Sequence, residues 1–343
     1  MKAIGFMTSQ AGTNAEALTD IEIDRPTPSG RDLLVRVKAI SVNPVDTKVR
    51  KRTTGTAGSY QVLGWDAVGE VAAVGEQVTG YRPGDKVWYA GDVTRPGANA
   101  EYHLVDERIV GKRPNTLSDA EAAAIPLTAI TAWELLFDRM CFDQVSGGEK
   151  TPGQRLLIVG AAGGVGSILT QLAKQLTGAT VIGTASRPES QKWVMDLGAD
   201  HVIDHNKPLS EELARVGIDN VTHVISLNHT EDHFDRLVEV LAPQGKFALI
   251  DDPETLLDIR KLKQKSISLH WELMFTRSMF ETEDMTKQRD LLNRVAELID
   301  AGAIRSTVGA NYGAICADNL RRAHRDIESG SAIGKIVLEG FDR

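Results

Sequence analysis

The chain contains little cysteine, no excess of basic residues and no long apolar run. Only Cys141 and Cys316 occur among 343 residues, so no disulfide framework is indicated and a reducing compartment fits. Lys and Arg number 39 against 47 Asp and Glu, a net charge of −8, which argues against a nucleic-acid or anionic-membrane partner. No stretch approaches the length of a membrane span and the first residues lack a secretion signal, so we expect a cytoplasmic protein.

The residues that are present predict two kinds of domain. Hydrophobic residues make up 42% of the chain, the balance of a globular protein long enough for two domains. Residues 1–127 hold short β-like runs separated by turn signals, which favours a barrel-like β domain with few helices. These runs are LLVRVKAISV (33–42), AVGEVAAVG (67–75), YRPGDKVWYAG (81–91) and AEYHLVDE (100–107).

From residue 128 onward, strand-like and helix-like segments alternate. Six apolar strands separated by helices predict an α/β domain with a doubly wound, parallel six-stranded sheet over 128–275. The strands are expected at 155–160, 179–184, 199–204, 222–227, 246–251 and 266–271. A long amphipathic helix (288–302) and a last strand (334–340) follow, so we expect residues 276–343 to return to the first domain.

A glycine-rich turn follows the first of these strands. The segment RLLIVGAAGGVG (155–166) ends a strand and opens a helix with an A-x-G-x-x-G pattern. A bare backbone lets a pyrophosphate approach, and the helix N-terminus offers free N–H groups and a positive dipole end. Gly166 is expected to let the helix pack closely on the strand. The residues predicted to bind a dinucleotide here are Gly160, Ala161, Gly163, Gly164, Val165 and Gly166.

The second strand of the alternation indicates which dinucleotide binds. An NAD site places an acid about 20 residues after the motif to bind the ribose 2′-hydroxyl, but Ser186 and Arg187 stand there. A hydroxyl and a guanidinium suit a 2′-phosphate, and Lys192 lies one helical turn further on. We therefore predict NADPH as the cofactor, with a solvated Arg187 as the alternative.

Several further motifs together resemble the medium-chain dehydrogenase/reductase superfamily over essentially the whole chain. They are Asn43-Pro44-Val45-Asp46, Gly64-Trp65-Asp66 with Gly69 and Gly75, Pro83-Gly84-Asp85-Lys86-Val87, and Thr128-Ala129-Ile130-Thr131-Ala132-Trp133. The resemblance implies a Rossmann domain beside a discontinuous GroES-like catalytic domain.

The same resemblance implies that the catalytic zinc of many relatives is missing. The three ligand positions fall on Asn43, Trp65 and near Leu127, which cannot form a tetrahedral N/S site, and two cysteines cannot supply a structural zinc lobe. The chain is thus similar to the zinc-free quinone oxidoreductase-like branch, whose members are often named zinc-type alcohol dehydrogenase-like. Without a Lewis acid, a quinone or an α,β-unsaturated carbonyl is the expected hydride acceptor.

The resemblance also implies roles for individual residues. Asn43 is expected to donate to the substrate oxygen or the nicotinamide ribose, and Lys48 to supply a proton or positive charge unless it is only a surface lysine. Thr131 is expected behind the nicotinamide and Asn228 at the ribose. Lys335 is expected near the phosphates and His205 near the adenosine phosphate, with a solvated histidine as the alternative.

Two other clusters have competing interpretations. Trp65, Met274 and Phe275 are predicted to shape a substrate pocket, with ordinary core packing as the alternative for the last two. His229 and His233 have the i, i+4 spacing of a metal pair, but no H-E-x-x-H motif accompanies them, so no metal site is predicted.

The preferred function is an NADPH-dependent, metal-independent reductase of quinones or enones. The alternatives are a zinc-dependent alcohol dehydrogenase with atypical ligands, and an NADPH-binding sensor or structural protein without turnover. Strand 266–271 is expected at the edge of the parallel sheet, where relatives join two subunits, so we expect a homodimer. The alternative is a monomer whose edge is protected by Lys263 and Lys265.

Overall fold

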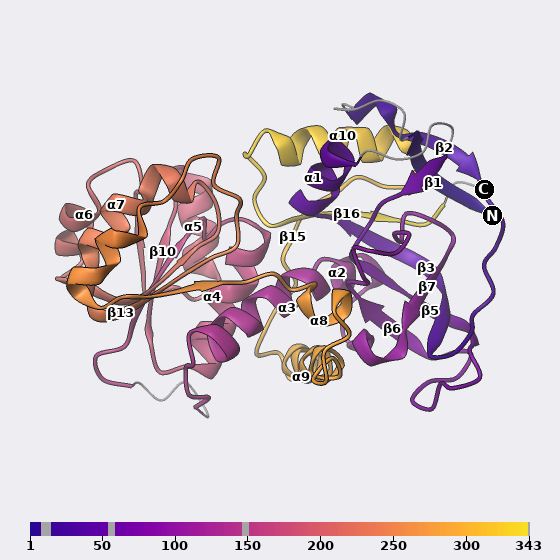
Figure 1. Cartoon of the computed structure of the whole chain (residues 1–343), viewed down its shortest axis with the longest axis horizontal. Coiled ribbons are helices and arrows are strands. Elements are labelled where there is room, and N and C mark those ends of the chain that lie inside the picture. The colour runs from indigo at the N-terminus through magenta and orange to yellow at the C-terminus, as the bar shows by residue number, and fades with distance from the viewer. Residues whose placement is uncertain (8–14, 54–58, 146–150, 342–343) are drawn as a thin grey trace. The chain divides into compact units, whose positions relative to one another are not determined.

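The computed structural model describes residues 1–7, 15–53, 59–145 and 151–341, and in it the chain divides into two units (Figure 1). Unit 1 comprises Met1–Ile130 and Phe275–Arg343, and unit 2 comprises Thr131–Met274. The sequence predicted boundaries at 127/128 and 275/276. The last strand, β16 (Lys335–Glu339), pairs antiparallel with β3 (Asp32–Val42), so unit 1 is built from both ends of the chain.

Unit 2 is the doubly wound domain that the strand–helix alternation predicted. Its six-stranded sheet has the order β11-β10-β9-β12-β13-β14, and every neighbouring pair is parallel. The strands are β9 (Arg155–Val159), β10 (Thr180–Thr184), β11 (His201–Ile203), β12 (Val221–Ser226), β13 (Leu241–Leu249) and β14 (Ser268–Trp271). The crossover helices are α4 (Gly164–Leu176), α5 (Pro188–Asp196), α6 (Leu209–Arg215) and α7 (Thr230–Val240). The order reverses between β9 and β12, where such sheets bind dinucleotides.

All six strands of this sheet differ from their predicted bounds by a residue or more, and β13 and β14 are two examples. β13 begins at Leu241 rather than near residue 246, and its pairing with β12 shifts register between Val221 and His223. β14 begins at Ser268 rather than 266, because Ser266 has a left-handed backbone (φ 52°) that ends the preceding 3₁₀ helix η4 (Ile259–Lys265). β14 still occupies the predicted edge of the sheet.

Unit 1 is rich in β structure, as predicted. Its larger sheet contains β15 (Val308–Asn311), β16, β3, β5 (Ala67–Val74), β6 (Lys86–Tyr89), β8 (Gly111–Lys112) and β7 (Tyr102–Asp106), and a smaller one contains β1 (Lys2–Met7), β2 (Thr19–Glu22) and β4 (Tyr60–Val62). The helices are α1 (Pro44–Arg52), α2 (Asp119–Ala123), α3 (Pro126–Trp133), α8 (Thr276–Met279), α9 (Lys287–Asp300) and α10 (Ala317–Glu328). Helix α3 crosses into unit 2.

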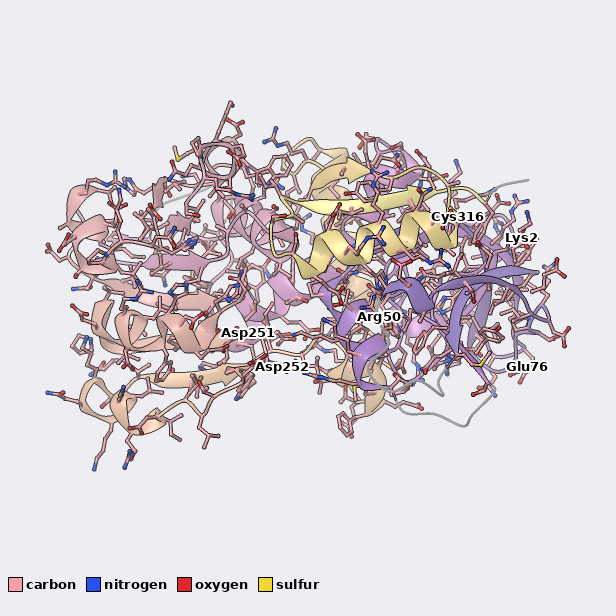
Figure 2. The ribbon with its side chains drawn as sticks, turned by 90° about the horizontal axis from the view of Figure 1, so that it is seen from above. Lys2, Arg50, Glu76, Asp251, Asp252 and Cys316 are labelled. Carbon is pink, nitrogen blue, oxygen red and sulfur yellow. The ribbon has the colours of Figure 1, made fainter. Side chains whose placement is uncertain are left out.

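A buried arginine joins α1 to α10, which lie side by side (Figure 2). The Arg50 side chain is fully buried; one guanidinium nitrogen lies 2.6 Å from His324 Nδ1 and another lies 2.5 Å from Glu328 Oε1. Partners at these distances are what a buried charge requires. Arg50 thus fixes the C-terminal helix α10 against α1, the helix that Asn43 caps.

One helical stretch is apolar enough to cross a membrane by length and composition. It runs over Asp119–Arg139, and 83% of its apolar window is buried inside the protein, which is typical of a core helix. Its last part, η3 (Glu134–Arg139), is a π-helix.

Candidate functional site

The glycine-rich turn of unit 2 joins β9 to α4 with almost no free space. Gly160 has φ 78°, a left-handed conformation that favours glycine. A Cβ on Gly166 would lie 2.5 Å from the Gly160 carbonyl oxygen and 2.6 Å from the Ala161 backbone. Gly166 is therefore required for the helix to approach the end of the strand, which is the role that the sequence analysis gave it.

Gly163 differs from Gly166 because the chain itself does not require a glycine there. A Cβ at Gly163 would meet its nearest neighbour, the Gly160 carbonyl oxygen, only at 3.5 Å. Gly163 caps α4, whose first turn presents the backbone N–H groups of Gly164 and Val165. A bare backbone at a helix N-terminus fits the pyrophosphate of a dinucleotide.

Two residues at the carboxyl ends of the central strands meet at the switch point. Gly160 follows β9 and Asn228 follows β12, and a Cβ on Gly160 would lie 2.5 Å from Asn228 Oδ1. The Gly160 N–H donates to Thr184 Oγ1 at the end of β10 (3.2 Å). The exposed Asn228 thus lies beside the turn, where a ligand of that turn can reach it.

Ser186 and Arg187 lie in the loop between β10 and α5. Ser186 is half-buried, while the Arg187 side chain is 44% exposed and its Nε lies 3.5 Å from Glu189 Oε1. Lys192 is turned to a different partner, since its Nζ lies 2.6 Å from Asp196 Oδ2. The positive side chain in this loop is therefore Arg187, and the predicted assistance from Lys192 would require it to leave Asp196.

Sequence reasoning missed two contacts that hold this region. The Trp193 indole on α5 donates to Ser167 Oγ (2.8 Å), and Ser167 Oγ lies 2.7 Å from the Gly163 carbonyl oxygen. Asp251, which follows β13, accepts from the backbone N–H (2.9 Å) and hydroxyl (2.6 Å) of Thr230 at the start of α7. A serine inside a helix and an acid just after an apolar strand were the available signals.

His205 and Thr131, both predicted to contact the cofactor, have neighbours within unit 2. The half-buried His205 ring packs edge-on against His233 with 5.7 Å between ring centres, and burial lowers the pKa of both histidines. Arg236 lies 2.7 Å from His233 Nδ1, so this ring nitrogen of the possible metal pair is already engaged. Thr131 is buried at the start of unit 2.

A buried polar cluster in unit 1 surrounds the Asp66 carboxylate, which has no exposed surface. Its Oδ1 accepts from the Leu127 backbone N–H (2.8 Å). Its Oδ2 accepts from the Ser41 hydroxyl and Asn43 Nδ2, both at 2.8 Å, and from Lys335 Nζ at 3.1 Å. Four donors from three parts of the chain, the end of β3, the start of α3 and the start of β16, therefore converge on one carboxylate.

Lys335 lies inside this cluster, not at a surface that a phosphate could reach. Its side chain is only 3% exposed, and its ammonium donates to the Val42 carbonyl (3.1 Å), to Asn43 Oδ1 and to Asp66. Burial lowers the pKa of the Lys335 ammonium, and the charge of Asp66 opposes that shift. The predicted phosphate contact is thus replaced by an internal ion pair, because β16 carries Lys335 against the end of β3.

A second buried carboxylate, Asp46, lies at the start of α1. Asp46 Oδ2 accepts from the Asn43 backbone N–H (2.6 Å) in a capping box. Burial raises the pKa of Asp46 to about 7, although the Asn43 N–H and the positive charge of Lys335 lower it. Lys48 is half-buried on the same helix.

The residues at the zinc-ligand positions do not form a zinc-binding donor set. The Trp65 indole Nε1 donates to the Asp92 carbonyl (3.0 Å), Leu127 offers only its N–H, and the Asn43 amide is held by Lys335 and Asp66. No group of three or more His, Cys, Asp or Glu side chains suited to a metal occurs among the described residues. Zinc needs nitrogen, sulfur or carboxylate ligands, and the carboxylate here already accepts four hydrogen bonds.

The residues predicted to line a substrate pocket are all buried. Within unit 1, Trp65 and Phe275 make an edge-to-face contact with ring centres 6.3 Å apart, and each is at most 2% exposed. Met274, the last residue of unit 2, is 4% exposed. This burial fits the core-packing alternative for Met274 and Phe275 at least as well as a pocket wall.

The two-unit fold and the nucleotide turn define a dinucleotide-dependent dehydrogenase or reductase. The zinc-binding dehydrogenase family matches residues 197–338, and the alcohol dehydrogenase GroES-like domain matches residues 29–115. A zinc-type alcohol dehydrogenase-like protein of Staphylococcus epidermidis is 39% identical over 98% of this chain and 99% of its own. This chain therefore belongs to the zinc-type alcohol dehydrogenase-like family within the medium-chain dehydrogenase/reductase superfamily.

Solved structures and a further relative known by sequence agree with this assignment. A Rhizobium etli CFN 42 protein described as a zinc-dependent alcohol dehydrogenase is 53% identical, with a TM-score of 0.93 over 100% of this chain and 99% of that one. Escherichia coli quinone oxidoreductase complexed with NADPH is 26% identical, with a TM-score of 0.82 over 99% and 100% of the two chains. A 2-methylene-furan-3-one reductase of Solanum lycopersicum is 29% identical over 94% of this chain and 73% of its own. A further solved relative, 26% identical with a TM-score of 0.82, is described as an NAD-dependent alcohol dehydrogenase, so the family is one of nicotinamide-dependent oxidoreductases.

Proposed function

We propose that this protein is an NADPH-dependent, metal-independent reductase that transfers hydride to a quinone or an α,β-unsaturated carbonyl. The observation that carries the proposal is the chemistry at the three positions where the resemblance places zinc ligands: Asn43 donates to Asp66, the Trp65 indole donates to the Asp92 carbonyl, and Leu127 offers only its N–H. A saturated carbonyl needs strong polarisation to accept hydride, which a Lewis acid provides. A conjugated acceptor needs less, because its negative charge spreads onto an enolate or hydroquinone oxygen.

The preference for NADPH rests on the loop after β10. No carboxylate stands at the position that binds a ribose 2′-hydroxyl, and the Arg187 guanidinium is exposed there. A guanidinium forms strong, paired hydrogen bonds with phosphate. The quinone oxidoreductase relative was solved with NADPH, which supports the same choice. NADPH supplies the hydride when bound.

The chain's own residues then bind and orient the reactants. The turn at Gly163 and the first N–H groups of α4 receive the pyrophosphate, and Arg187 with Ser186 receives the 2′-phosphate. By the family resemblance, Asn43 donates its amide hydrogen to the substrate oxygen as negative charge develops there. We place such an enzyme in the cytoplasm, in keeping with its two cysteines.

The test is a turnover assay on protein stripped with a chelator and analysed for metals. NADPH oxidation is followed with a quinone, a cyclic enone, a saturated ketone and an aldehyde. We expect the quinone or the enone to be reduced, the saturated ketone to be inert, and the chelator to have no effect. Activity confined to the saturated carbonyls and lost on chelation would favour a zinc-dependent alcohol dehydrogenase. Tight NADPH binding without turnover on any acceptor would favour a sensor or structural protein.

A further inference from the structure

Three stretches of the chain that hold the zinc-ligand positions converge on one buried ion pair. Val42 ends β3 and Asn43 follows it, Asp66 follows Trp65, and Leu127 is the second residue of α3. Each of these stretches contacts Lys335 or Asp66. The ion pair is deeply buried, with side-chain exposures of 3% for Lys335 and 0% for Asp66. The centre that a metal-dependent relative would build from these stretches already contains a cation in this chain.

The ammonium of Lys335 has the contacts that such a cation needs. It has three N–H donors, and the three acceptors are a backbone carbonyl, an amide oxygen and a carboxylate. The carboxylate supplies the compensating charge, without which a buried ammonium is unstable. Each acceptor adjoins a regular element, since Val42 ends β3, Asn43 caps α1 and Asp66 directly precedes β5.

The ion pair also determines how the Asn43 amide is oriented. Lys335 can only donate and the ionised Asp66 can only accept, so the amide oxygen must face Lys335 and the amide nitrogen must face Asp66. Nδ2 carries two hydrogens. One goes to Asp66, and the other has no acceptor among the hydrogen bonds of the described residues. Polarisation of the oxygen by an ammonium strengthens that remaining donor.

We propose that Lys335 is a tethered cation that takes the place of the metal ion in this site, and that it acts by holding Asn43 as a hydrogen-bond donor. Lys335 is thus a positioning residue and Asn43 is the residue that touches the substrate. The inference rests on the proposed function for the role of Asn43, while the tethered cation itself can be tested without turnover.

The first experiment tests the cation and needs no activity. Lys335→Ala removes the ammonium and leaves a space that n-propylammonium matches. We expect Lys335→Ala to melt at a lower temperature than wild type, and n-propylammonium chloride to restore part of the loss. Tetramethylammonium, which has no N–H donor, should not restore the melting temperature. Lys51→Ala is the matched control, since Lys51 is 55% exposed in its ion pair with Glu328 and should respond to neither ion.

The second experiment tests the action through Asn43. Lys335→Met should lower kcat for the best acceptor about tenfold or more, with a smaller change in KM, and should cause little further loss in an Asn43→Ala background. Additive losses in the double variant would show that Lys335 is merely structural. If Lys335→Ala is too unstable to purify, Lys335→Met and Lys335→Arg give the same comparison, with Arg retaining the charge.

The outcomes separate the inference from the proposed function. The tethered cation would be overturned if Lys335→Ala melted at the same temperature in propylammonium and in tetramethylammonium. One zinc ion bound per wild-type chain would overturn it as well. Propylammonium rescue in a protein that reduces no acceptor would support the cation and contradict the reductase. If the protein reduces an enone but propylammonium does not rescue Lys335→Ala and the losses of Lys335→Met and Asn43→Ala are additive, the reductase is supported and the tethered cation is contradicted.

Discussion

Burial of the Asp46 carboxylate should make the stability of the folded protein sensitive to pH. The pKa of Asp46 is raised from 3.8 to about 7, so the folded state holds this proton more tightly than the unfolded state. Its contribution to stability is present below about pH 4 and is lost as the pH rises through about 7. The slope approaches about 1.4 kcal/mol per pH unit where only the folded state is protonated.

Asp46→Asn should remove this dependence, because the amide oxygen can still accept from the Asn43 N–H. Urea unfolding at pH values between about 4 and 8 should show wild type losing stability relative to the variant as the pH rises. Asp318→Asn is the control, since this side chain is 86% exposed. Parallel stability curves for wild type and Asp46→Asn would contradict the raised pKa.

Arg187 should determine the choice between the two nicotinamide cofactors. Arg187→Ala removes one charge-assisted contact with a 2′-phosphate, worth ~1–3 kcal/mol. We expect NADPH to bind about 10- to 100-fold more weakly, while NADH binding changes little. Calorimetric titration of both cofactors measures this.

A substitution at Glu189 should have the opposite effect on NADPH binding from Arg187→Ala. Its carboxylate lies 3.5 Å from the Arg187 guanidinium and competes with a phosphate for it. Glu189→Gln should therefore tighten NADPH binding and leave NADH unchanged. If wild type binds NADPH and NADH equally well, the role assigned to this loop is wrong.

At the scale of the element, we expect two glycines of the turn between β9 and α4 to act differently, Gly166 in folding and Gly163 in cofactor binding. Gly166→Ala forces a methyl group to within 2.5 Å of the Gly160 carbonyl, so it should lower the melting temperature of the free protein. Gly163→Ala meets nothing closer than 3.5 Å and should melt like wild type, but bind NADPH more weakly. Scanning calorimetry with and without cofactor distinguishes the two. A Gly166→Ala variant that melts like wild type, or a Gly163→Ala variant that binds NADPH as tightly as wild type, would contradict these roles.

Elements were more predictable from the sequence than contacts. The parallel sheet follows from local patterns, because each apolar run and each amphipathic helix is readable within about a dozen residues. The role of Gly166 could be predicted because the carbonyl oxygen that excludes a side chain there belongs to Gly160, only six residues earlier. The bond between Lys335 and Asn43 spans 292 positions. No local pattern indicates that a lysine at the start of the last strand is buried, and a lysine is ordinarily exposed.

At the scale of the whole molecule, β14 leaves one edge of the parallel sheet open, and we propose that a second copy pairs there. Lys265 does not protect this edge, because its ammonium donates to the carbonyls of Val238, Glu239 and Leu241 at the end of α7. Trp271 on β14 is 55% exposed. An exposed edge strand with a large apolar side chain favours pairing about a two-fold axis.

Trp271→Glu should therefore shift the protein toward monomers in light scattering after size exclusion. This variant is preferable to Leu269→Pro, because Leu269 packs against the core of unit 2 and its loss would also unfold the protein. Met195→Glu is the control, with a side chain 47% exposed on α5, near the other end of the sheet. A monomeric wild type, or a dimer that Trp271→Glu leaves intact, would contradict the proposed pairing.

In the proposed reaction, hydride goes to a conjugated carbon rather than to a metal-polarised carbonyl carbon. The direct measurement uses NADPH carrying deuterium at the transferable position, a cyclic enone and chelator-treated protein, with the product analysed by NMR. We expect a saturated ketone with deuterium on the β-carbon. Deuterium on the carbinol carbon of an allylic alcohol would contradict it.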